Sequence, residues 1–405
     1  MLMKPFILQN NIYWIGALHP DLRVFDIIMQ TKNGSTYNSY LILDEKIVVI
    51  DTVKEKFADQ YVEHITELVD PRRIDYIVVQ HTEPDHSGSL NQLLYAAPQA
   101  KVICAKAAVK YVQNTLNREV SIQPVGIKET LSLGSKSLMF LPAPFIHWPD
   151  TMMTYLVEDQ ILFSCDLFGA HICDSRMFDD LLARDAWPDF QYYFDSIMRP
   201  FKKNVRNALG KLADLSIKTI APSHGPILRS AISRYIDAYA KWSEPKTLNH
   251  PPILLIYYAS AHGYTAMMAE TIAAGAKSRG VQVNVMDAEE IDMNDHVLQI
   301  EAADAVLWGS PTINNDAVKP IWEILSSLAS IDVKGKLAGS FGSYAWSGEA
   351  VQVLNDRLTA MKFRVPFEGV TALLRPSETE LQQCFDFGVR IAEQMYADQK
   401  QEPSH

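Results

Sequence analysis

The sequence predicts an α/β protein of two domains, the second of which is a doubly wound parallel sheet. Three observations predict this. The chain has 405 residues, which is too long for one ordinary hydrophobic core. The stretch "SEPKTLNHPP" (243–252) has three prolines and no apolar periodicity, as a linker does. After it, short apolar runs alternate with helical patterns, which is typical of a parallel sheet covered by helices. We therefore expect domains at 1–248 and 252–400.

Composition and charge exclude several classes of protein. Hydrophobic residues make up 48% and charged residues 21%, which is ordinary for a globular chain. The net charge is −11 with no basic cluster, so we expect no nucleic-acid partner. No apolar run approaches the ~20 residues that span a bilayer, so we expect no membrane association. The start "MLMKPFILQNN" lacks the apolar core of a signal peptide, which predicts a cytoplasmic protein.

The four cysteines form no C-x-x-C pair. A zinc ribbon, an embedded rubredoxin site and a thioredoxin motif are therefore all unsupported. Most of the cysteines have apolar neighbours in the sequence, so we expect ordinary buried thiols. They are Cys104, Cys165, Cys173 and Cys384.

In the first domain, strand-like runs end at polar clusters. "YLILDEKIVVIDT" (40–52) predicts two strands around a turn, and "IDYIVVQ" (74–80) predicts a short strand. Helical patterns cover 55–69, 105–117 and 226–242. In the second domain, helices are expected at 264–279, 317–329 and 348–362, between the runs "ILLIYYAS", "VQVNVMD", "DAVLWGS", "KLAGSFGS" and "EGVTALLR".

The stretch "HTEPDHSGS" (81–89) raises the question of a metal site. His81, Glu83 and Asp85 alternate directly after the predicted strand 74–80, and His86 follows at once. Imidazole and carboxylate groups are the common protein ligands of transition metals. Taken alone, the stretch is also compatible with a polar turn that caps the next helix.

Three further segments favour the metal site. "PAPFIHWPDTM" places His147 where a strand gives way to a loop, "ILFSCDLFG" places Asp166 at the end of an apolar strand, and "TIAPSHGP" does the same for His224. One such residue alone is more often structural. Three of them at strand ends, together with the cluster at 81–86, predict one metal centre built from several junctions between strands and loops.

With these residues the first domain resembles the metallo-β-lactamase superfamily, whose motif H-x-H-x-D-H is followed by a His, a bridging Asp and a last His. The resemblance implies an αββα sandwich. Here Glu83 replaces the second His of the motif, as in the flavodiiron family. Zinc hydrolases use mainly neutral imidazoles, whereas added carboxylates suit iron and stabilise its ferric state.

The flavodiiron resemblance implies a ligand set. His81, Glu83 and His147 would hold one iron. Asp85, His224 and His86 would hold the other, with His86 either a ligand or a bystander, and Asp166 would bridge the two.

The resemblance also bears on residues near the irons. Tyr193 matches a family position whose hydroxyl can face the iron pocket, and is otherwise a core aromatic. His171 is either a proton source or a structural histidine. Many members have a His after "LR-x-F", but this chain reads "DLRVFDI" with Asp26, so no preference for O2 or NO is carried over.

In the second domain, three loops follow apolar strands: "ASAHGYT" (259–265), "WGSPTINND" (308–316) and "FGSYAWSGEA" (341–350). None of them has the G-x-G-x-x-G or G-x-x-x-x-G-K-[ST] pattern, which disfavours a dinucleotide fold and excludes a P-loop. Ligands bind at the carboxyl ends of strands in open α/β sheets, and a phosphate suits the start of a helix. The three loops together resemble flavodoxin, which implies FMN. The implied contacts are Ser260, His262, Gly263, Tyr264 and Thr265 for the phosphate, and Pro311, Thr312, Ile313, Asn314, Ser343, Tyr344, Ala345, Trp346 and Gly348 for the flavin ring, on which Trp346 would stack.

The resemblance implies an oxidoreductase that reduces O2 to water, NO to N2O, or both. Electrons would pass from an external donor, such as a rubredoxin or a reduced deazaflavin, through FMN to the diiron centre. The family architecture implies a head-to-tail homodimer or a dimer of dimers, in which Trp148 would contact the partner's flavin. Two alternatives stay open: a zinc-dependent hydrolase with a flavodoxin module, and a flavodoxin-like carrier with an inactive metal domain.

Overall fold

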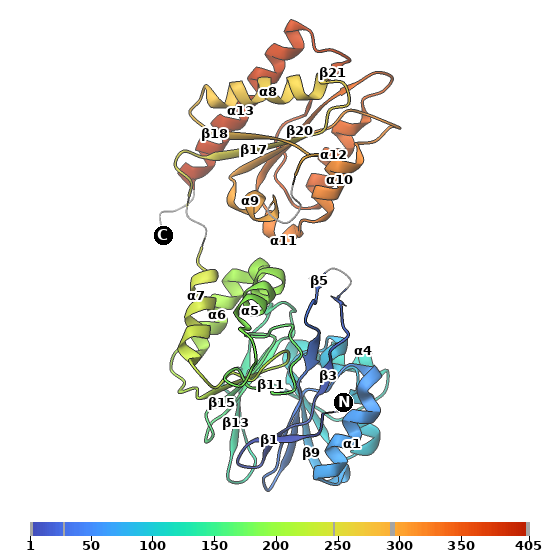
Figure 1. Cartoon of the computed structure of the whole chain (residues 1–405), viewed down its shortest axis with the longest axis vertical. Helices are drawn as coiled ribbons and strands as arrows, with labels where there is room; N and C mark the ends of the chain where they lie inside the picture. The colour runs from blue at the N-terminus through green and yellow to red at the C-terminus, as the bar shows by residue number, and fades with distance from the viewer. Residues whose placement is uncertain (1–2, 27–28, 246–247, 292–295, 402–405) are drawn as a thin grey trace. The chain divides into compact units, whose positions relative to one another are not determined.

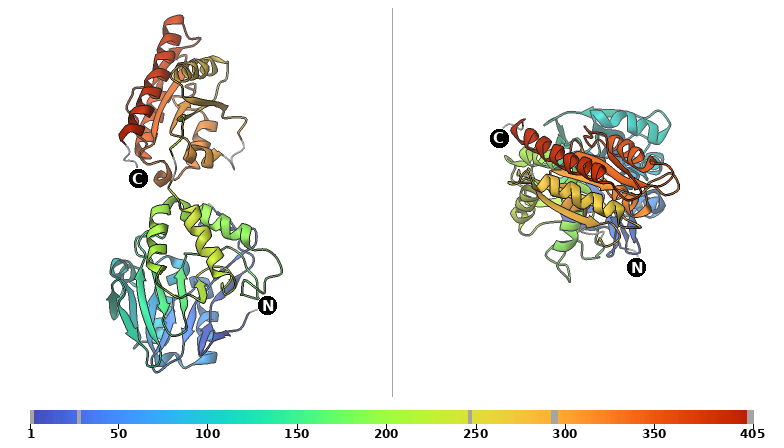
Figure 2. Two further views of the ribbon diagram at one scale, coloured as in Figure 1. Left: turned by 90° about the vertical axis from the view of Figure 1, so that its left-hand side faces the viewer. Right: turned by 90° about the horizontal axis from the view of Figure 1, so that it is seen from above.

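The computed structural model describes residues 3–26, 29–245, 248–291 and 296–401. It divides into two compact units, Met1–Pro245 and Lys246–His405 (Figures 1 and 2). Both units combine helices with sheets, which confirms the predicted α/β class. Positions 246 and 247 of the predicted linker lie outside the described residues.

The first unit contains two large sheets. One has the order β1-β2-β7-β8-β9-β10-β11, with bounds Phe6–Gln9, Ile12–Trp14, Tyr40–Ile42, Ile47–Ile50, Ile74–Val79, Lys101–Ala105 and Ile122–Val125. The other has the order β12-β13-β14-β15-β16, with bounds Thr130–Ser132, Ser137–Pro142, Met152–Leu156, Ile161–Cys165 and Thr219–Pro222. Two short ribbons pair β3 with β6 and β4 with β5, with bounds Ala17–His19, Ser35–Tyr37, Val24–Phe25 and Met29–Gln30. The predicted pair of strands at 40–52 forms β7 and β8.

Helices cover the outer face of each sheet. The first group comprises α1 (Ala58–Leu68), α3 (Leu90–Ala96) and α4 (Val109–Leu116). The 3-10 turns η1 (Glu55–Phe57), η2 (Pro71–Arg73) and η3 (Lys106–Ala108) and the one-turn helix α2 (Pro84–Ser87) lie in the connections between these elements. The second group comprises α5 (Trp187–Tyr193), η4 (Phe194–Met198), η5 (Arg199–Phe201), α6 (Lys202–Leu212) and α7 (Ile232–Trp242).

The helix expected at 226–242 begins only at Ile232. The Ile227 N–H instead donates to the Met177 carbonyl, and Leu228 exchanges two backbone hydrogen bonds with Ile220. The apolar pattern extended the predicted helix too far, because sheet-like pairing with distant residues overrides a local periodicity.

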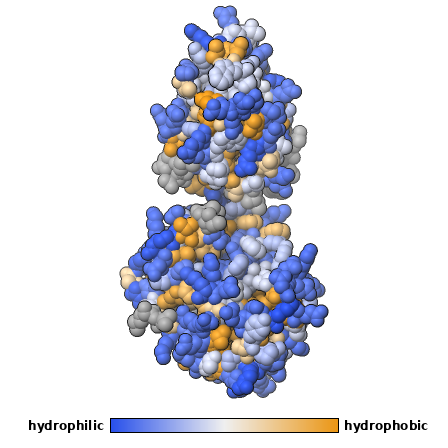
Figure 3. Space-filling model, turned by 90° about the vertical axis from the view of Figure 1, so that its right-hand side faces the viewer, coloured by the Kyte–Doolittle hydropathy of each residue, from blue (hydrophilic) through white to orange (hydrophobic). Residues whose placement is uncertain are grey.

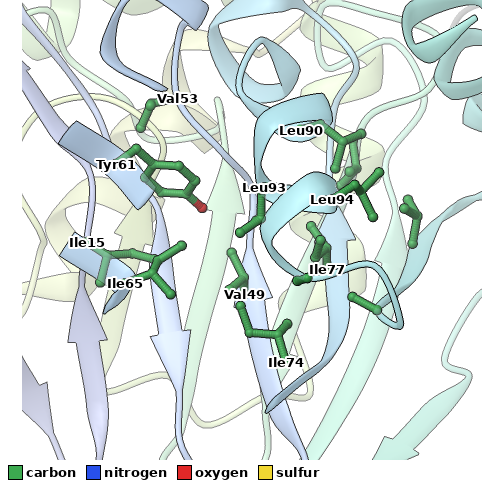
Figure 4. Packing of buried hydrophobic residues seen from close by; sticks show 14 of the residues in the cluster. Ile15, Val49, Val53, Tyr61, Ile65, Ile74, Ile77, Leu90, Leu93 and Leu94 are labelled. Atoms are coloured by element: carbon green, nitrogen blue, oxygen red, sulfur yellow. The ribbon is translucent and has the colours of Figure 1, made fainter. Parts of the chain in front are cut away.

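Strand alternation explains the layers of the first unit. Val49, Ile77 and Val79 pack on one face of the first sheet with residues of α1 and α3. Figure 4 shows Val49 and Ile77 among these side chains. Val48 and Val78 point the other way and pack between the two sheets. Successive strand residues point to opposite faces, so one strand supplies both cores. Each buried Val or Ile stabilises the fold by about 1.5–3 kcal/mol relative to an exposed one.

The second unit has one parallel sheet of order β18-β17-β19-β20-β21, with bounds Gln282–Asp287, Ile253–Tyr258, Ala305–Gly309, Leu337–Tyr344 and Val370–Leu373. This is the strand order of the doubly wound flavodoxin type. Helices α8 (Tyr264–Lys277) and α13 (Glu378–Gln401) cover one face, and α9 (His296–Ala302), α10 (Lys319–Ser326) and α12 (Glu349–Ala360) pack on the other (Figure 1). A short α11 spans Ser330–Val333.

The surface agrees with the composition. The face in Figure 3 is mostly hydrophilic, with apolar side chains scattered over it. Among the described residues, no helix has the length and apolar character needed to cross a membrane. Three of the four cysteines are buried as expected, whereas Cys173 is only partly buried, and all four are free thiols.

Candidate functional site

Four of the predicted ligands follow strand β9. His81 and Glu83 lie in the loop after this strand, and Pro84 starts the one-turn helix α2, which carries Asp85 and His86. Proline is favoured at the first position of a helix because its missing N–H would have no helical partner there. The four predicted ligands are all buried.

The other three predicted metal ligands lie at strand ends of the second sheet. His147 lies in the turn between β13 and β14, Asp166 directly follows β15, and His224 is the second residue after β16. Asp166 and His224 are buried, whereas 16% of the His147 side chain is exposed. Strand ends from both sheets therefore deliver side chains to one place, and the folded scaffold holds them there.

One group of side chains gathers around Oδ2 of Asp166. This oxygen lies 3.4 Å from Nε2 of His147 and 3.7 Å from Nε2 of His81. Oε2 of Glu83 lies 3.1 Å from Nε2 of His81 and 3.3 Å from Nε2 of His147. Two imidazoles and two carboxylates thus surround one position.

A second group gathers around the other oxygen of Asp166. Oδ1 lies 3.1 Å from Nε2 of His86 and 3.4 Å from Nε2 of His224. The carboxylate of Asp85 lies 3.7 Å from Nε2 of His86 and 3.1 Å from Nε2 of His224. Asp166 is therefore shared between the two groups, with one oxygen turned toward each.

Several of these buried atoms have no hydrogen bond. Both oxygens of Asp85, and Nε2 of His86, are without a hydrogen-bond partner among the described residues. A buried carboxylate without a partner is strongly unfavourable. Nitrogen and oxygen atoms that approach this closely without aligning as hydrogen bonds converge on a common point, as the ligands of a cation do. The donor set of this centre therefore fits two metal ions.

The charges of the centre reinforce one another. Burial lowers the pKa of His147, but the close carboxylates of Asp166 and Glu83 outweigh burial and raise that pKa to about 10. Burial also lowers the pKa of His224, but the close carboxylates of Asp166 and Asp85 outweigh burial and raise that pKa to about 9. Burial would raise the pKa of Asp166, but the charge of His86 and the close imidazoles of His147 and His224 hold it well below its usual range. In the metal-free protein, protons on the imidazoles balance the carboxylates.

Three of the four imidazoles are oriented through Nδ1. The contacts are His81 Nδ1 to Asp150 Oδ1 at 3.3 Å, His86 Nδ1 to Asp51 Oδ2 at 3.5 Å and His224 Nδ1 to the Thr36 carbonyl oxygen at 2.7 Å. Such partners fix the ring so that Nε2 faces the centre. The sequence analysis missed all three partners, although Asp51 also directly follows an apolar strand and could have been found by that signal.

Tyr193 and His171 both lie at the centre. Tyr193 ends α5 and is buried, and its hydroxyl donates to Oδ1 of Asp166 at 3.2 Å. The ring of His171 lies 5.0 Å from that of Tyr193 and 5.3 Å from that of His224. Nδ1 of His171 is 2.8 Å from the Ser35 hydroxyl, whereas its Nε2 has no hydrogen-bond partner among the described residues. Burial, and then the charge of His224, hold the pKa of His171 well below its usual value.

Asp26 is also close to the centre. Its side chain shares a hydrogen bond with Glu83. Partial burial, this bond and the charges of Glu83 and Asp85 raise the pKa of Asp26 to about 7. A carboxyl group therefore stands beside the centre where many members of the family that the chain resembles have an imidazole.

The second unit has a cleft of about 280 Å³ at the carboxyl ends of its strands. All three predicted loops line it. The predicted residues among the lining are His262, Tyr264, Pro311, Thr312, Ile313, Asn314, Ser343, Tyr344, Ala345 and Trp346. Trp346 is 95% exposed, so its ring is free to cover a ligand.

Four predicted residues do not line the cleft but shape its loops. The Ser260 hydroxyl accepts a hydrogen bond from the Ala266 N–H at 3.1 Å, and the hydroxyls of Thr265 and Ser343 are 2.9 Å apart. Gly263 caps α8 with a φ of +80°, a conformation that favours glycine. The fourth residue, Gly348, caps the start of α12.

Four further residues line the cleft and were missed: Ala261, Asn315, Ser347 and Leu374. The first three directly adjoin predicted residues. Leu374 follows β21, and only the order of the strands in the sheet places it at the cleft.

Comparison with known proteins agrees with both units. The family described as "ODP family beta lactamase" matches residues 36–225, and the flavodoxin family matches residues 256–388. The predicted fold class, a metallo-β-lactamase-like unit followed by a flavodoxin-like one, is thereby confirmed.

Relatives match over nearly the whole chain. The flavo-diiron protein FprA2 of Clostridium acetobutylicum is 41% identical over 96% of this chain and 99% of its own length. The nitric oxide reductase of Moorella thermoacetica is 36% identical over 96% of this chain and 98% of its own. The structure of the rubredoxin oxygen:oxidoreductase from Desulfovibrio gigas superposes with a TM-score of 0.72 at 29% identity, over 98% of this chain and 100% of that chain. The chain belongs to the flavodiiron family.

Proposed function

We propose that this chain is an oxidoreductase that reduces O2 to water, NO to N2O, or both, at a non-haem diiron centre supplied with electrons by FMN. Its relatives carry the names nitric oxide reductase and rubredoxin oxygen:oxidoreductase, which supports both substrates. Reducing O2 to two water molecules takes four electrons and four protons. Two ferrous ions and one reduced FMN hold four electrons, so the two cofactors together suffice.

The single observation that carries the proposal is the sharing of Asp166. Each of its oxygens faces a separate group of imidazole and carboxylate ligands. His81, Glu83 and His147 would hold one iron, Asp85, His86 and His224 the other, with Asp166 between them. The inward Nε2 of His86, which has no hydrogen bond, supports its role as a ligand.

The composition of the centre favours iron over zinc. Glu83 stands where zinc hydrolases of this fold have a histidine, and it lies against both His81 and His147. With Asp85 and Asp166, the two metals would share three carboxylates. Such anionic oxygen ligands stabilise the ferric state that redox turnover requires.

FMN would occupy the cleft of the second unit. Its phosphate would lie on the loop that precedes α8, where the first N–H groups of the helix have no helical partner. The loops at 311–314 and 343–348 would hold the flavin ring on its two sides, with Trp346 stacked on it. The exposed apolar lining, which includes Ile313 and Trp346, supports an aromatic ligand.

Residues beside the irons would hold protons and orient the bridge. The Tyr193 hydroxyl donates to Asp166 and so limits the positions that this carboxylate takes. His171 is neutral at pH 7, and one of its nitrogens has no partner among the described residues and is free to bind a substrate or water.

Electrons would come from an external carrier, for which a rubredoxin or a reduced deazaflavin are the candidates. The chain would act as a head-to-tail homodimer or a dimer of dimers, so that one subunit's flavin lies beside the partner's irons. Trp148 would take part in that contact. Its ring lies 5.0 Å from that of His81, which places it at the edge of the metal centre.

One experiment separates the three functions. The purified protein is analysed for metals and flavin, reduced without oxygen, and mixed with O2 and NO separately in a stopped-flow instrument. We expect about two irons and one FMN per chain, with rapid reoxidation by at least one gas. Zinc with hydrolase activity would support the hydrolase instead. Unchanged O2 consumption in a Glu83→Ala variant would support the electron carrier with an inactive metal domain.

A further inference from the structure

The cleft of the second unit has an uncharged lining. Among the described residues that line it there is no lysine, arginine, aspartate or glutamate. Three side chains of the lining can ionise, namely the imidazole of His262 and the phenols of Tyr264 and Tyr344. Phenols are neutral near pH 7, whereas an imidazole can carry a positive charge there. Within this lining, His262 is therefore the group that can offer a cation to a ligand.

The helix that starts at the cleft already uses part of its capacity for anions. The first N–H groups of a helix have no helical partner and attract negative charge. In α8, however, the Ala266 N–H donates to the Ser260 hydroxyl at 3.1 Å. Thr265 is 1% exposed, and its hydroxyl lies 2.9 Å from that of Ser343. The chain itself thus occupies two polar groups at this end of the helix, which leaves more of an anion's charge to His262.

His262 is placed to reach a ligand in the cleft. It lies in the exposed turn before α8, next to Gly263, where an added Cβ would meet no atom within 4 Å. Its ring lies 6.5 Å from that of Tyr264, and neither ring nitrogen has a hydrogen-bond partner among the described residues. Because no other group competes for the imidazole, both of its nitrogens are available to an incoming ligand.

The charges around the cleft are mostly negative. The turn after β18 adjoins β17, because the Ala288 N–H donates to the Tyr258 carbonyl oxygen at 2.7 Å. Lys319, on α10, is paired with Glu323 at 3.2 Å. The carboxylates repel an anion over a Debye length of ~8 Å in physiological salt, and one guanidinium opposes them. These side chains adjoin the loops of the cleft but lie outside its lining: Asp287, Glu289, Glu290, Asp316, Glu349 and Arg375.

The ligand that the cleft would take brings an anion with it. Under the proposed function this ligand is FMN, whose phosphate carries about 1.5–2 negative charges at pH 7. Riboflavin has the same ring and ribityl chain but no phosphate. Backbone N–H groups would bind the phosphate equally at any pH near neutrality, whereas an imidazolium at His262 would bind it only while the ring is protonated. The two contributions can therefore be told apart.

We propose that His262 is the residue by which the cleft selects a phosphorylated flavin, and that it does so as an imidazolium, so that FMN binding takes up a proton. The proposal rests on the proposed function only in that the cleft binds a flavin. A negative charge within about 4–6 Å favours the charged form of an imidazole. The phosphate therefore draws a proton from solvent onto His262, and the new N–H donates to a phosphate oxygen. Affinity for FMN is highest where the imidazole is already charged and falls as the pH rises.

The first test compares FMN with riboflavin in the full-length chain after its flavin has been removed. Fluorescence titration at pH 7 gives a Kd for each ligand, and the wild type should bind FMN more tightly. His262→Asn should weaken FMN binding by about 10- to 100-fold, which is the contribution of one charge-assisted hydrogen bond. Riboflavin binding should not change in this variant, which shows that the cleft is still formed. Arg375→Gln, at an exposed cation outside the lining, is the matched control and should change neither affinity by more than about twofold.

The second test follows the proton between pH 7 and 9. The phosphate loses its second proton near pH 6, so its own ionisation does not contribute in this range. The affinity of the wild type for FMN should fall by up to about tenfold per pH unit, while its affinity for riboflavin stays constant. In His262→Lys, whose ammonium stays charged over this range, FMN affinity should stay high and lose its dependence on pH. Calorimetry in two buffers of different ionisation enthalpy should detect proton uptake with FMN in the wild type and none in His262→Asn.

The outcomes separate the role of His262 from the function on which it rests. Equal affinities for FMN and riboflavin in the wild type would overturn the selection of a phosphate while the flavin site stands. So would a preference for FMN that His262→Asn retains, or an FMN affinity that is constant between pH 7 and 9. A wild-type chain that binds neither flavin would overturn the proposed function itself.

Discussion

The metal centre of the first unit and the cleft of the second are built in opposite ways. The centre takes buried side chains from distant strand ends, and Asp150, Asp51 and Thr36 fix three of its imidazoles from behind. The cleft takes exposed loop residues, of which Trp346 is 95% and Ile313 47% exposed.

The difference follows from what each site would bind. A metal ion needs several atoms that converge on one point at short distances, so the scaffold must hold them in advance. A flat aromatic ligand gains most from contact area, which side chains can supply as they become ordered on binding. A single substitution in the centre should therefore disrupt metal binding as a whole, whereas a single substitution in the cleft should weaken FMN binding only in part.

The largest effect is expected for Asp166→Ala. This change removes the carboxylate that both groups share and leaves four imidazoles with less negative charge to balance them. Metal analysis should show iron falling from about two ions per chain to almost none, because binding depends on a complete ligand set. Flavin absorbance should not change. Asp214→Ala, at an exposed position, is the matched control, and two retained irons in Asp166→Ala would show that this carboxylate is not the bridge.

A large pH dependence is expected for metal loading. In the metal-free protein the pKa of His147 is about 10 and that of His224 about 9, so both hold protons at pH 7. A protonated imidazole cannot bind a metal, so affinity should rise with pH by about tenfold per unit for each proton displaced. Calorimetry in two buffers of different ionisation enthalpy would measure the protons released. Affinity that is constant between pH 6 and 8 would contradict these protonation states.

The imidazoles of His147 and His224 give the stability of the metal-free fold the opposite dependence on pH. Their folded pKa values lie above the unfolded value of 6.5, so they stabilise the fold most below that pH. This contribution is lost as the pH rises through about 9 and about 10. Thermal unfolding of the metal-free protein should therefore occur at a lower temperature at pH 10 than at pH 7.

A smaller loss is expected for Asp150→Asn. The Asp150 carboxylate contacts Nδ1 of His81 at 3.3 Å and accepts hydrogen bonds from the N–H and hydroxyl of Thr82. Its loss should lower metal affinity by about 10- to 100-fold, as for other partners behind a ligand. Chelator competition would measure this, with the exposed Asp237→Asn as control. Equal affinities would mean that the backbone alone orients His81.

The smallest effect is expected for Trp346→Ala in the cleft. Loss of one stacked ring should weaken FMN binding by about three- to tenfold, since an aromatic pair contributes about 0.5–1.5 kcal/mol beyond its buried area. Fluorescence titration of the flavin-free protein would measure the Kd, with Tyr95→Ala, at another exposed aromatic, as control. A loss of all FMN binding would show that the cleft is as dependent on single residues as the metal centre.

Local patterns in the sequence predicted many of the elements and several of the polar residues that the structure gathers at the metal centre. Apolar runs that end in His81, Asp166 or His224 indicate strands with polar ends, and the structure brings these ends together. The same logic located the three loops of the cleft, because ligands bind at the carboxyl ends of parallel strands.

The sequence by itself determined which side chains are available for chemistry, since apolar periodicity marks the strands and the polar residues at their ends stand out. Only the tertiary structure decided which atoms meet: the two oxygens of Asp166 facing separate groups, and Leu374 at the cleft. The physical reason is the separation along the chain over which each kind of information extends. Periodicity reports on neighbours a few residues apart, whereas these contacts join strands and loops that approach each other only when the sheets and their helices pack.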